Sequence, residues 1–287
     1  MIIMSKEKQS AITDKQFIFY FLFLFLLVQV VGLFVAYNYY LKDIQFSVFG
    51  DPNSVFNAIF IVGYIIFLTG IILILKKYFK SGKYIFVFEF LALFFAIGII
   101  FEIFLPFYLA YFLAVVLLFF KNKFESKKIT LWYNNLLLAL AIAGAGALLG
   151  LGLGILPIII LLSLLAIYDI VAVFYTKHMV SLAKLIIAKK VSLIFLLPSK
   201  RRLYRLGGGD FAIPTAVSSS LFNVLIKSYS FSIVIIPIIF VWISAVVGMF
   251  LTFYILDKKK VKALPALPIQ VGLMIIVIVI TYFILLY

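Results

Sequence analysis

The chain has 287 residues, of which 67% are hydrophobic and only 12% are charged. A soluble domain is roughly half apolar and about a quarter charged, so this composition excludes a water-soluble globular protein and predicts a polytopic membrane protein. The formal net charge of +15 comes from short basic clusters between apolar runs, which indicates membrane topology and contact with lipid headgroups rather than nucleic-acid binding.

Two residue counts restrict the chemistry. Cysteine is absent, which excludes disulfides, thiolate nucleophiles and cysteine-based metal sites. Histidine occurs once, as His178, so a histidine cluster for a metal is excluded too. We therefore expect no metal and no organic cofactor, and we interpret His178 as a residue of the membrane interface rather than a ligand.

The apolar runs define the predicted helices in chain order. A helical span needs about 20 apolar residues to cross ~30 Å of hydrocarbon. The first run follows a polar tail and is too long for a signal-peptide core, so we expect it to be retained. Two long runs must each hold two spans, because one is interrupted by Glu102 and Pro106 and the other by a glycine-rich segment. The predicted spans are residues 17–37, 55–75, two in 84–120, two in 131–176 with a break at 150–157, then 210–226, 231–256 and 267–287. The fold class is therefore all-α, a polytopic membrane protein with nine transmembrane helices.

The basic residues test this count. If the N-terminus is cytoplasmic and the nine spans alternate, all of the 25 basic residues except Lys42 and Lys227 lie on the cytoplasmic side. Such a bias is typical of multi-pass membrane proteins. The sequence thus predicts a cytoplasmic N-terminus, an external C-terminus and a multi-pass protein of the cell membrane.

Three regions follow from this topology. Residues 1–176 hold spans one to six, residues 177–209 form a basic cytoplasmic loop, and residues 210–287 hold spans seven to nine. In the loop, residues 178–190 alternate apolar side chains with lysine and serine, which predicts an amphipathic helix at the interface. Glycines 146, 150 and 154 are spaced four apart, which favours close contact between helices.

Two aspartates, Asp169 and Asp210, lie in stretches that otherwise indicate burial in lipid. A carboxylate inside a bilayer costs at least ~2.5–3.5 kcal/mol, so such residues are functional candidates. Asp169 precedes Lys177 by about 12 Å of helix, and Asp210 follows Arg205 by roughly 8 Å, so both are expected at a similar depth below the cytoplasmic surface. A close pair would share one proton, and could then activate water and protonate a scissile amide. A polar ladder in span seven indicates a wet site; it consists of Thr215, Ser218, Ser219, Ser220 and Asn223.

The residues around these aspartates resemble a known protease family. YDIVAV, beginning at Tyr168, resembles the YD motif of the presenilin and signal peptide peptidase aspartyl proteases, and GGGDF, beginning at Gly207, resembles their GxGD motif. Their PAL motif is matched at the start of the last span by Pro265, Ala266 and Leu267. The YDIVAV string, the longer string KALPALPI and the predicted orientation are most similar to a compact, archaeal-type presenilin homologue.

The resemblance implies an intramembrane aspartyl endopeptidase that hydrolyses peptide bonds within transmembrane segments of membrane-protein substrates. Asp169 and Asp210 would be the catalytic pair, and residues 203–208 would pair with an unwound substrate as a β-strand. We expect the enzyme to act without accessory subunits. The residues that would shape the site and its substrate cleft are Tyr168, Gly207, Gly208, Gly209, Pro265, Ala266 and Leu267.

Other interpretations of the carboxylates remain open at this point. A proton- or ion-coupled transporter would also use a carboxylate pair as a relay, and a non-catalytic scaffold or ion leak is a third possibility. The PAL motif favours the protease, because a relay does not need it. Glu89, within span three, is expected to pair with a partner or line a water cavity rather than act in catalysis. Asp257, beside three lysines at the inner end of span eight, is expected to be solvated.

Overall fold

The computed structural model describes residues 2–5, 14–42, 50–79, 82–121, 123–189, 191–199, 203–259 and 263–286. The predictions made above for Lys190, residues 200–202, residues 260–262 and residue 287 lie outside these ranges. Within them, the protein is mostly helical.

A helix occupies each of the nine predicted spans in the described part of the chain. The helices are α1 (Asp14–Leu41), α2 (Val55–Tyr78), α3 (Tyr84–Phe101), α4 (Phe107–Phe119), α5 (Lys127–Leu151), α6 (Ile155–Ile170), α7 (His178–Ala188), α8 (Gly209–Leu225), α9 (Phe231–Lys259) and α10 (Leu267–Thr281). Short π-helical turns extend α6 and α10; they are η1 (Val171–Tyr175) and η2 (Tyr282–Leu286). The chain breaks between α3 and α4 and between α5 and α6, as the sequence predicts.

Seven of the described helices are long and apolar enough to cross a bilayer, so the chain is a polytopic membrane protein. They are α1, α2, α3, α5, α6 with η1, α9, and α10 with η2. Of the other two predicted spans, α4 has 13 residues and α8 has 17. Helix α8 is also rich in hydroxyl side chains, and it lies inside the protein rather than against lipid.

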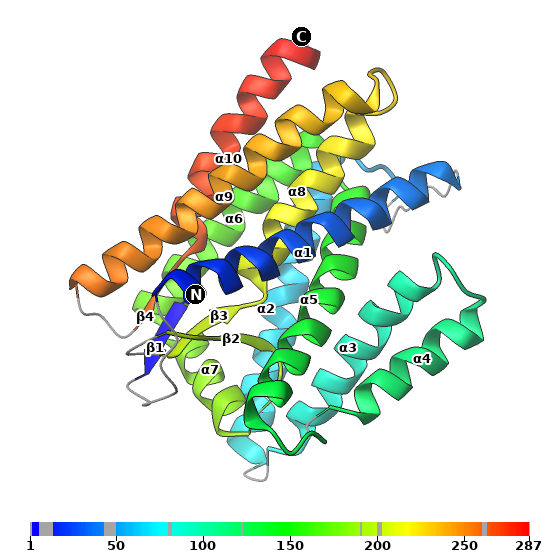
Figure 1. The fold of residues 1–287 in the computed structure, drawn as a ribbon. Coiled ribbons are helices and arrows are strands. Elements are labelled where there is room, and N and C mark those ends of the chain that lie inside the picture. The colour runs from blue at the N-terminus through cyan, green and yellow to red at the C-terminus, as the bar shows by residue number, and fades with distance from the viewer. Residues whose placement is uncertain are drawn as a thin grey trace.

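The structure corrects the all-α expectation, because four segments form an antiparallel sheet at one end of the helices (Figure 1). The strands are β1 (Ile2–Ser5), β2 (Ile194–Pro198), β3 (Leu203–Gly207) and β4 (Ala263–Leu264), in the order β2-β3-β1-β4. The C-terminus lies at the far end of α10 from the sheet (Figure 1). Only β3 falls in a segment for which a strand was expected. β1 and β4 have partners far away in the sequence, whereas β2 pairs with the nearby β3.

Helix α8 is the centre of the bundle. It contacts α1, α5, α6 and α9, and nearly every residue from Asp210 to Phe222 is buried. Two of the predicted contact glycines explain how α5 approaches it. A Cβ atom would lie 2.0 Å from the carbonyl oxygen of Ala216 if added at Gly150, and 2.9 Å from that of Ala212 if added at Gly146. The third glycine, Gly154, lies instead against Asn53 at the start of α6. Glycine at 146 and 150 therefore sets the position of α8, which carries Asp210.

Candidate functional site

Asp169 lies near the end of α6, two residues before the helix becomes π-helical at Val171. The residue is only 3% exposed. The backbone N–H of Leu267, the first residue of α10, donates to Asp169 Oδ2 at 3.3 Å. N–H groups in the first turn of a helix have no partner within the helix and carry a partial positive charge, so they stabilise a carboxylate. The start of α10 thus provides a binding position for the Asp169 side chain.

Asp210 follows an abrupt change from strand to helix. β3 ends at Gly207, and α8 begins at Gly209. Asp210 is 1% exposed and lies in the first turn of α8, where the helix dipole favours its negative charge. The neighbouring Gly209 is exposed, and a Cβ atom added there would meet no atom within 4 Å. Open space therefore adjoins a buried carboxylate.

The three glycines before Asp210 have no positive φ angle. Gly208 has the ordinary helical φ of −58°, and among the described glycines only Gly82 has a positive φ. A Cβ atom at Gly208 would approach the side chain of Ile142 to 2.8 Å. Glycine at position 208 is therefore explained by its small size and not by unusual dihedral angles.

The structure brings the two aspartates together. Helices α6 and α8 are in contact. Both aspartates also contact the first turn of α10. Leu267 donates to the Asp169 side chain, and Gln270 Nε2 donates to the carbonyl oxygen of Asp210 at 2.9 Å. Two buried aspartates thus lie beside the start of α10, which directly follows Pro265 and Ala266.

The PAL residues connect the sheet to α10. β4 ends at Leu264, Pro265 and Ala266 are buried, and Leu267 begins the helix. A sharp start of α10 at this point is what aims the Leu267 N–H at Asp169. Sequence analysis named these residues from the resemblance, but the backbone hydrogen bond could not be inferred from it.

The side chains of Tyr168 and of its neighbour Asp169 have different hydrogen-bond partners. Its hydroxyl lies 3.0 Å from His178 Nε2, and His178 Nδ1 lies 2.6 Å from the hydroxyl of Thr176. Burial lowers the pKa of His178, which favours the neutral ring with one donor and one acceptor nitrogen. That His178 is an interfacial residue stays a prediction, and its hydrogen bond to Tyr168 links the start of α7 to the YD motif.

The polar ladder of α8 makes several hydrogen bonds to backbone carbonyls. Ser220 donates to the carbonyl oxygen of Leu153 at 2.7 Å, and Asn223 donates to that of Leu151 at 3.2 Å. Thr215 and Ser218 donate to carbonyls within their own helix. The hydroxyl of Ser219 is buried with no hydrogen-bond partner among the described residues. The wet site expected from this ladder stays a prediction.

Strand β3 has both of its edges occupied. It pairs with β2 on one side and with β1 on the other, with Ile2 opposite Leu206. On its far side β1 pairs with β4, where Ile2 lies opposite Leu264. The chain's own N-terminal strand thus lies between the strand that leads to Asp210 and the strand that leads to Pro265.

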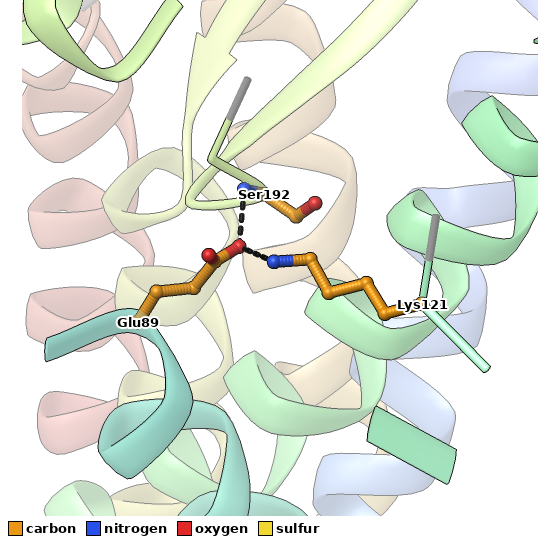
Figure 2. Close-up of polar contacts among 3 residues, drawn as sticks. All are labelled: Glu89, Lys121 and Ser192. Carbon is orange, nitrogen blue, oxygen red and sulfur yellow. Dashed lines mark hydrogen bonds and ion pairs between the residues drawn. The ribbon is translucent and has the colours of Figure 1, made fainter. Parts of the chain in front are cut away.

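The other two acidic residues singled out above have partners. Glu89 is buried on α3, where its carboxylate binds the ammonium of Lys121 and accepts from the backbone N–H of Ser192 (Figure 2). The expected pairing of Glu89 is confirmed, and it holds the segment before β2 against α3. Asp257 is exposed at the end of α9, as expected, and the hydroxyl of Tyr204 donates to its two oxygens at 3.0 and 3.2 Å.

Sequence reasoning missed three buried amides near the site. Gln29 and Gln270 donate to the carbonyls of Phe211 and Asp210. Asn135 on α5 accepts from the N–H of Leu196 and donates to its C=O, which docks β2 on the helix. Gln29 and Gln270 are isolated amides inside apolar runs, and Asn135 follows Asn134 near the start of one; a polar amide in such a run is the signal that could have identified them.

Comparisons with known proteins agree with this architecture. A family model described as signal-peptide peptidase, presenilin aspartyl protease matches residues 22–206, well over half of the chain. The match includes Asp169 and ends before Asp210 and the PAL residues. No curated protein matches the chain.

Two solved structures, both described as a presenilin family intramembrane aspartate protease, have a similar fold. The C222 crystal form has a TM-score of 0.60 and 20% identity, and the P2 form has a TM-score of 0.61 and 22% identity. Each comparison covers 90% of this chain and 94% of the other. At these identities the similarity shows a shared fold.

Proposed function

Since the chain belongs to the signal-peptide peptidase and presenilin aspartyl protease family, we propose that it is a GxGD-type intramembrane aspartyl endopeptidase. It hydrolyses peptide bonds within transmembrane segments of membrane proteins. Asp169 and Asp210 are its catalytic pair. The observation that carries this proposal is that two almost fully buried aspartates, on the contacting helices α6 and α8, are both hydrogen-bonded by the first turn of α10.

Such a pair holds one proton in its active state, because two adjacent buried carboxylates cannot both be charged cheaply. The ionised aspartate takes a proton from water, and the resulting hydroxide attacks the scissile carbonyl carbon. The protonated aspartate donates to the carbonyl oxygen, and a proton then passes to the leaving amine as the C–N bond breaks. The proton count balances over the cycle, so no cofactor or metal is needed.

The substrate must present an extended backbone, because a helix uses its own carbonyls in internal hydrogen bonds. The edge of β3 next to Asp210 is suited to hold an unwound segment by strand addition. β1 now occupies that edge, so in this proposal β1 leaves when substrate binds. Exposed Gly209 borders the open space where the scissile bond would lie.

The proposed topology is nine transmembrane helices with a cytoplasmic N-terminus, in the cell membrane. The distribution of basic residues supports it, since only Lys42 and Lys227 would lie outside. Helix α8 can cross the membrane despite its polar side chains, because α1, α5, α6 and α9 surround it. Helix α7 and the sheet would then lie at the cytoplasmic face; α7, β2 and β3 belong to the loop of residues 177–209.

A proton- or ion-coupled transporter, the rival use of two aspartates, is less well supported. A relay needs a chain of groups that can pass protons or bind ions. The hydroxyls of Ser218 and Ser220 are instead engaged with helix backbone, as is the amide of Asn223. The bond from Leu267 to Asp169 has no evident purpose in a relay.

The test is cleavage by purified protein reconstituted with a single-span substrate. Asp169→Asn and Asp210→Asn keep side-chain size but remove the acid, so each is expected to abolish cleavage. Glu125→Gln, an exposed carboxylate, is the matched control and keeps full activity. Cleavage that persists in either aspartate variant, or its absence from the wild type, contradicts the proposal.

A further inference from the structure

Helix α8 contains a proline close to Asp210. In an α-helix the N–H of residue i donates to the carbonyl of residue i−4, and proline has no N–H. Pro214 therefore leaves the carbonyl oxygen of Asp210 without its helical donor. A buried carbonyl without a partner is costly, and here it belongs to the residue whose position matters most.

Gln270 supplies the missing hydrogen bond. Its Nε2 donates to the carbonyl oxygen of Asp210 at 2.9 Å, and its side chain is fully buried. A donor to a carbonyl must be the amide nitrogen, which fixes the orientation of the side chain. Gln270 lies one turn after Leu267, so a single turn of α10 holds the backbone of Asp210 and the side chain of Asp169.

The packing around Gln270 leaves its backbone little freedom. A Cβ atom added at Gly248 on α9 would lie 2.6 Å from the Cα of Gln270 and 3.0 Å from its backbone nitrogen. Its Oε1 atom is buried with no hydrogen-bond partner among the described residues. Burying an amide whose oxygen is unsatisfied disfavours folding relative to leucine, so stability alone does not account for glutamine here.

We propose that Gln270 is a positioning residue. Its amide replaces the backbone hydrogen bond to the Asp210 carbonyl that Pro214 removes. It thereby holds the first turn of α8 in the position that places Asp210 near Asp169. This inference rests on the proposed proteolysis by the two aspartates. In this proposal the first turn of α10 fixes the positions of both aspartates.

The test is a rescue experiment. Gln270→Leu keeps similar volume but cannot donate, and it is expected to lower kcat by about 10- to 100-fold, the effect of a small misplacement of a catalytic group, with KM nearly unchanged. Pro214→Ala restores a backbone N–H at the place where Asp210 needs one. The double variant Pro214→Ala/Gln270→Leu should therefore recover most of the activity of Pro214→Ala alone.

Gln29→Leu is the matched control. Gln29 donates to the next carbonyl, that of Phe211, at 3.2 Å. That carbonyl also accepts from the hydroxyl of Thr215, and position 215 has a backbone N–H. Gln29→Leu is therefore expected to lower activity less than Gln270→Leu does, and adding Pro214→Ala should not restore the activity lost in Gln29→Leu.

The pH profile gives a second measurement. A pair that is pulled apart interacts more weakly, so its two apparent pKa values move closer together. The profile of Gln270→Leu should be narrower than that of the wild type, and the double variant should restore the width.

Wild-type activity in Gln270→Leu, or a double variant that is folded but inactive, overturns the inference. The double variant decides the question even if Gln270→Leu does not fold. Failure of the proposed function looks different, because Asp210→Asn would then cleave like the wild type or the wild type would not cleave.

Discussion

Asp169 and Asp210 are proposed to act together, but different kinds of hydrogen bond hold them in place. The side chain of Asp169 receives a backbone N–H, whereas the backbone of Asp210 receives a side-chain amide. Both donors come from α10. The positions of both aspartates therefore depend on the same helix.

His178 gives a pH-dependent prediction at this scale. Burial lowers its pKa in the folded protein below the usual value of about 6.5. As the pH falls through about 6.5, the unfolded chain takes up the proton before the folded one does, so the folded state loses stability. Above that pH both states hold a neutral ring, and the contribution is constant.

His178→Gln keeps a polar side chain that does not titrate. We expect the melting temperature of the wild type in micelles to fall further than that of His178→Gln between pH 7.5 and about pH 5. The difference is small because the ring is partly exposed. Parallel curves for the two proteins would contradict the expected state of the ring.

The predicted helices follow from features that a sequence displays directly. Apolar runs of the right length mark the spans, and Glu102 with Pro106 marks the break between α3 and α4. Asp169 and Asp210 are conspicuous because carboxylates are rare in such runs. Gln29 and Gln270 were overlooked, since an amide in an apolar run does not say which carbonyl it will reach.

The sheet could not be predicted for a different reason. Its strands come from residues 2–5, 194–198, 203–207 and 263–264. β2 and β3 are neighbours in the sequence, but β1 joins them to β4 only through partners far along the chain. β1 and β2 are short and apolar, which makes them indistinguishable from ends of helices by periodicity. The position of β1 between β3 and β4 is therefore seen only in the folded structure.

The contact between α5 and α8 predicts opposite effects for the same substitution at two glycines. Alanine normally stabilises a helix by about 1 kcal/mol relative to glycine. At Gly63 on α2 a Cβ atom meets nothing within 4 Å, so Gly63→Ala should be neutral or stabilising. At Gly150 it would collide with the backbone of Ala216, so Gly150→Ala should destabilise by about 1–3 kcal/mol.

Thermal unfolding of Gly63→Ala and Gly150→Ala in the same detergent measures these changes in stability. Cleavage assays of the two variants show whether α8 has moved. Gly150→Ala is expected to lose activity together with stability. Equal melting temperatures for the two variants would mean that α5 and α8 are not packed as described.

Strand β1 yields a prediction about substrate binding. Deleting residues 2–5 frees the edge of β3 that is proposed to receive the substrate. KM for a single-span substrate should fall while kcat stays similar, because the competing strand is removed. Stability should fall as well, since the side chain of Ile2 is fully buried. A rise in KM would show instead that β1 helps to build the substrate site.

At the scale of the whole molecule, the absence of cysteine makes the topology easy to test. Lys227→Cys should react with a membrane-impermeant thiol reagent added outside intact cells. Lys128→Cys should react only after the membrane is made permeable. Labelling of Lys128→Cys in intact cells would reverse the orientation proposed here or change the number of spans.

The central claim is that two aspartates hydrolyse a peptide bond inside a transmembrane segment by activating water. Mass spectrometry of the products formed in heavy-oxygen water tests it most directly. The account predicts a cut within the apolar segment of the substrate, one heavy oxygen atom in the new carboxyl group, and no such product from Asp169→Asn or Asp210→Asn. A cut confined to the polar flanks, or the same product from either variant, would contradict it.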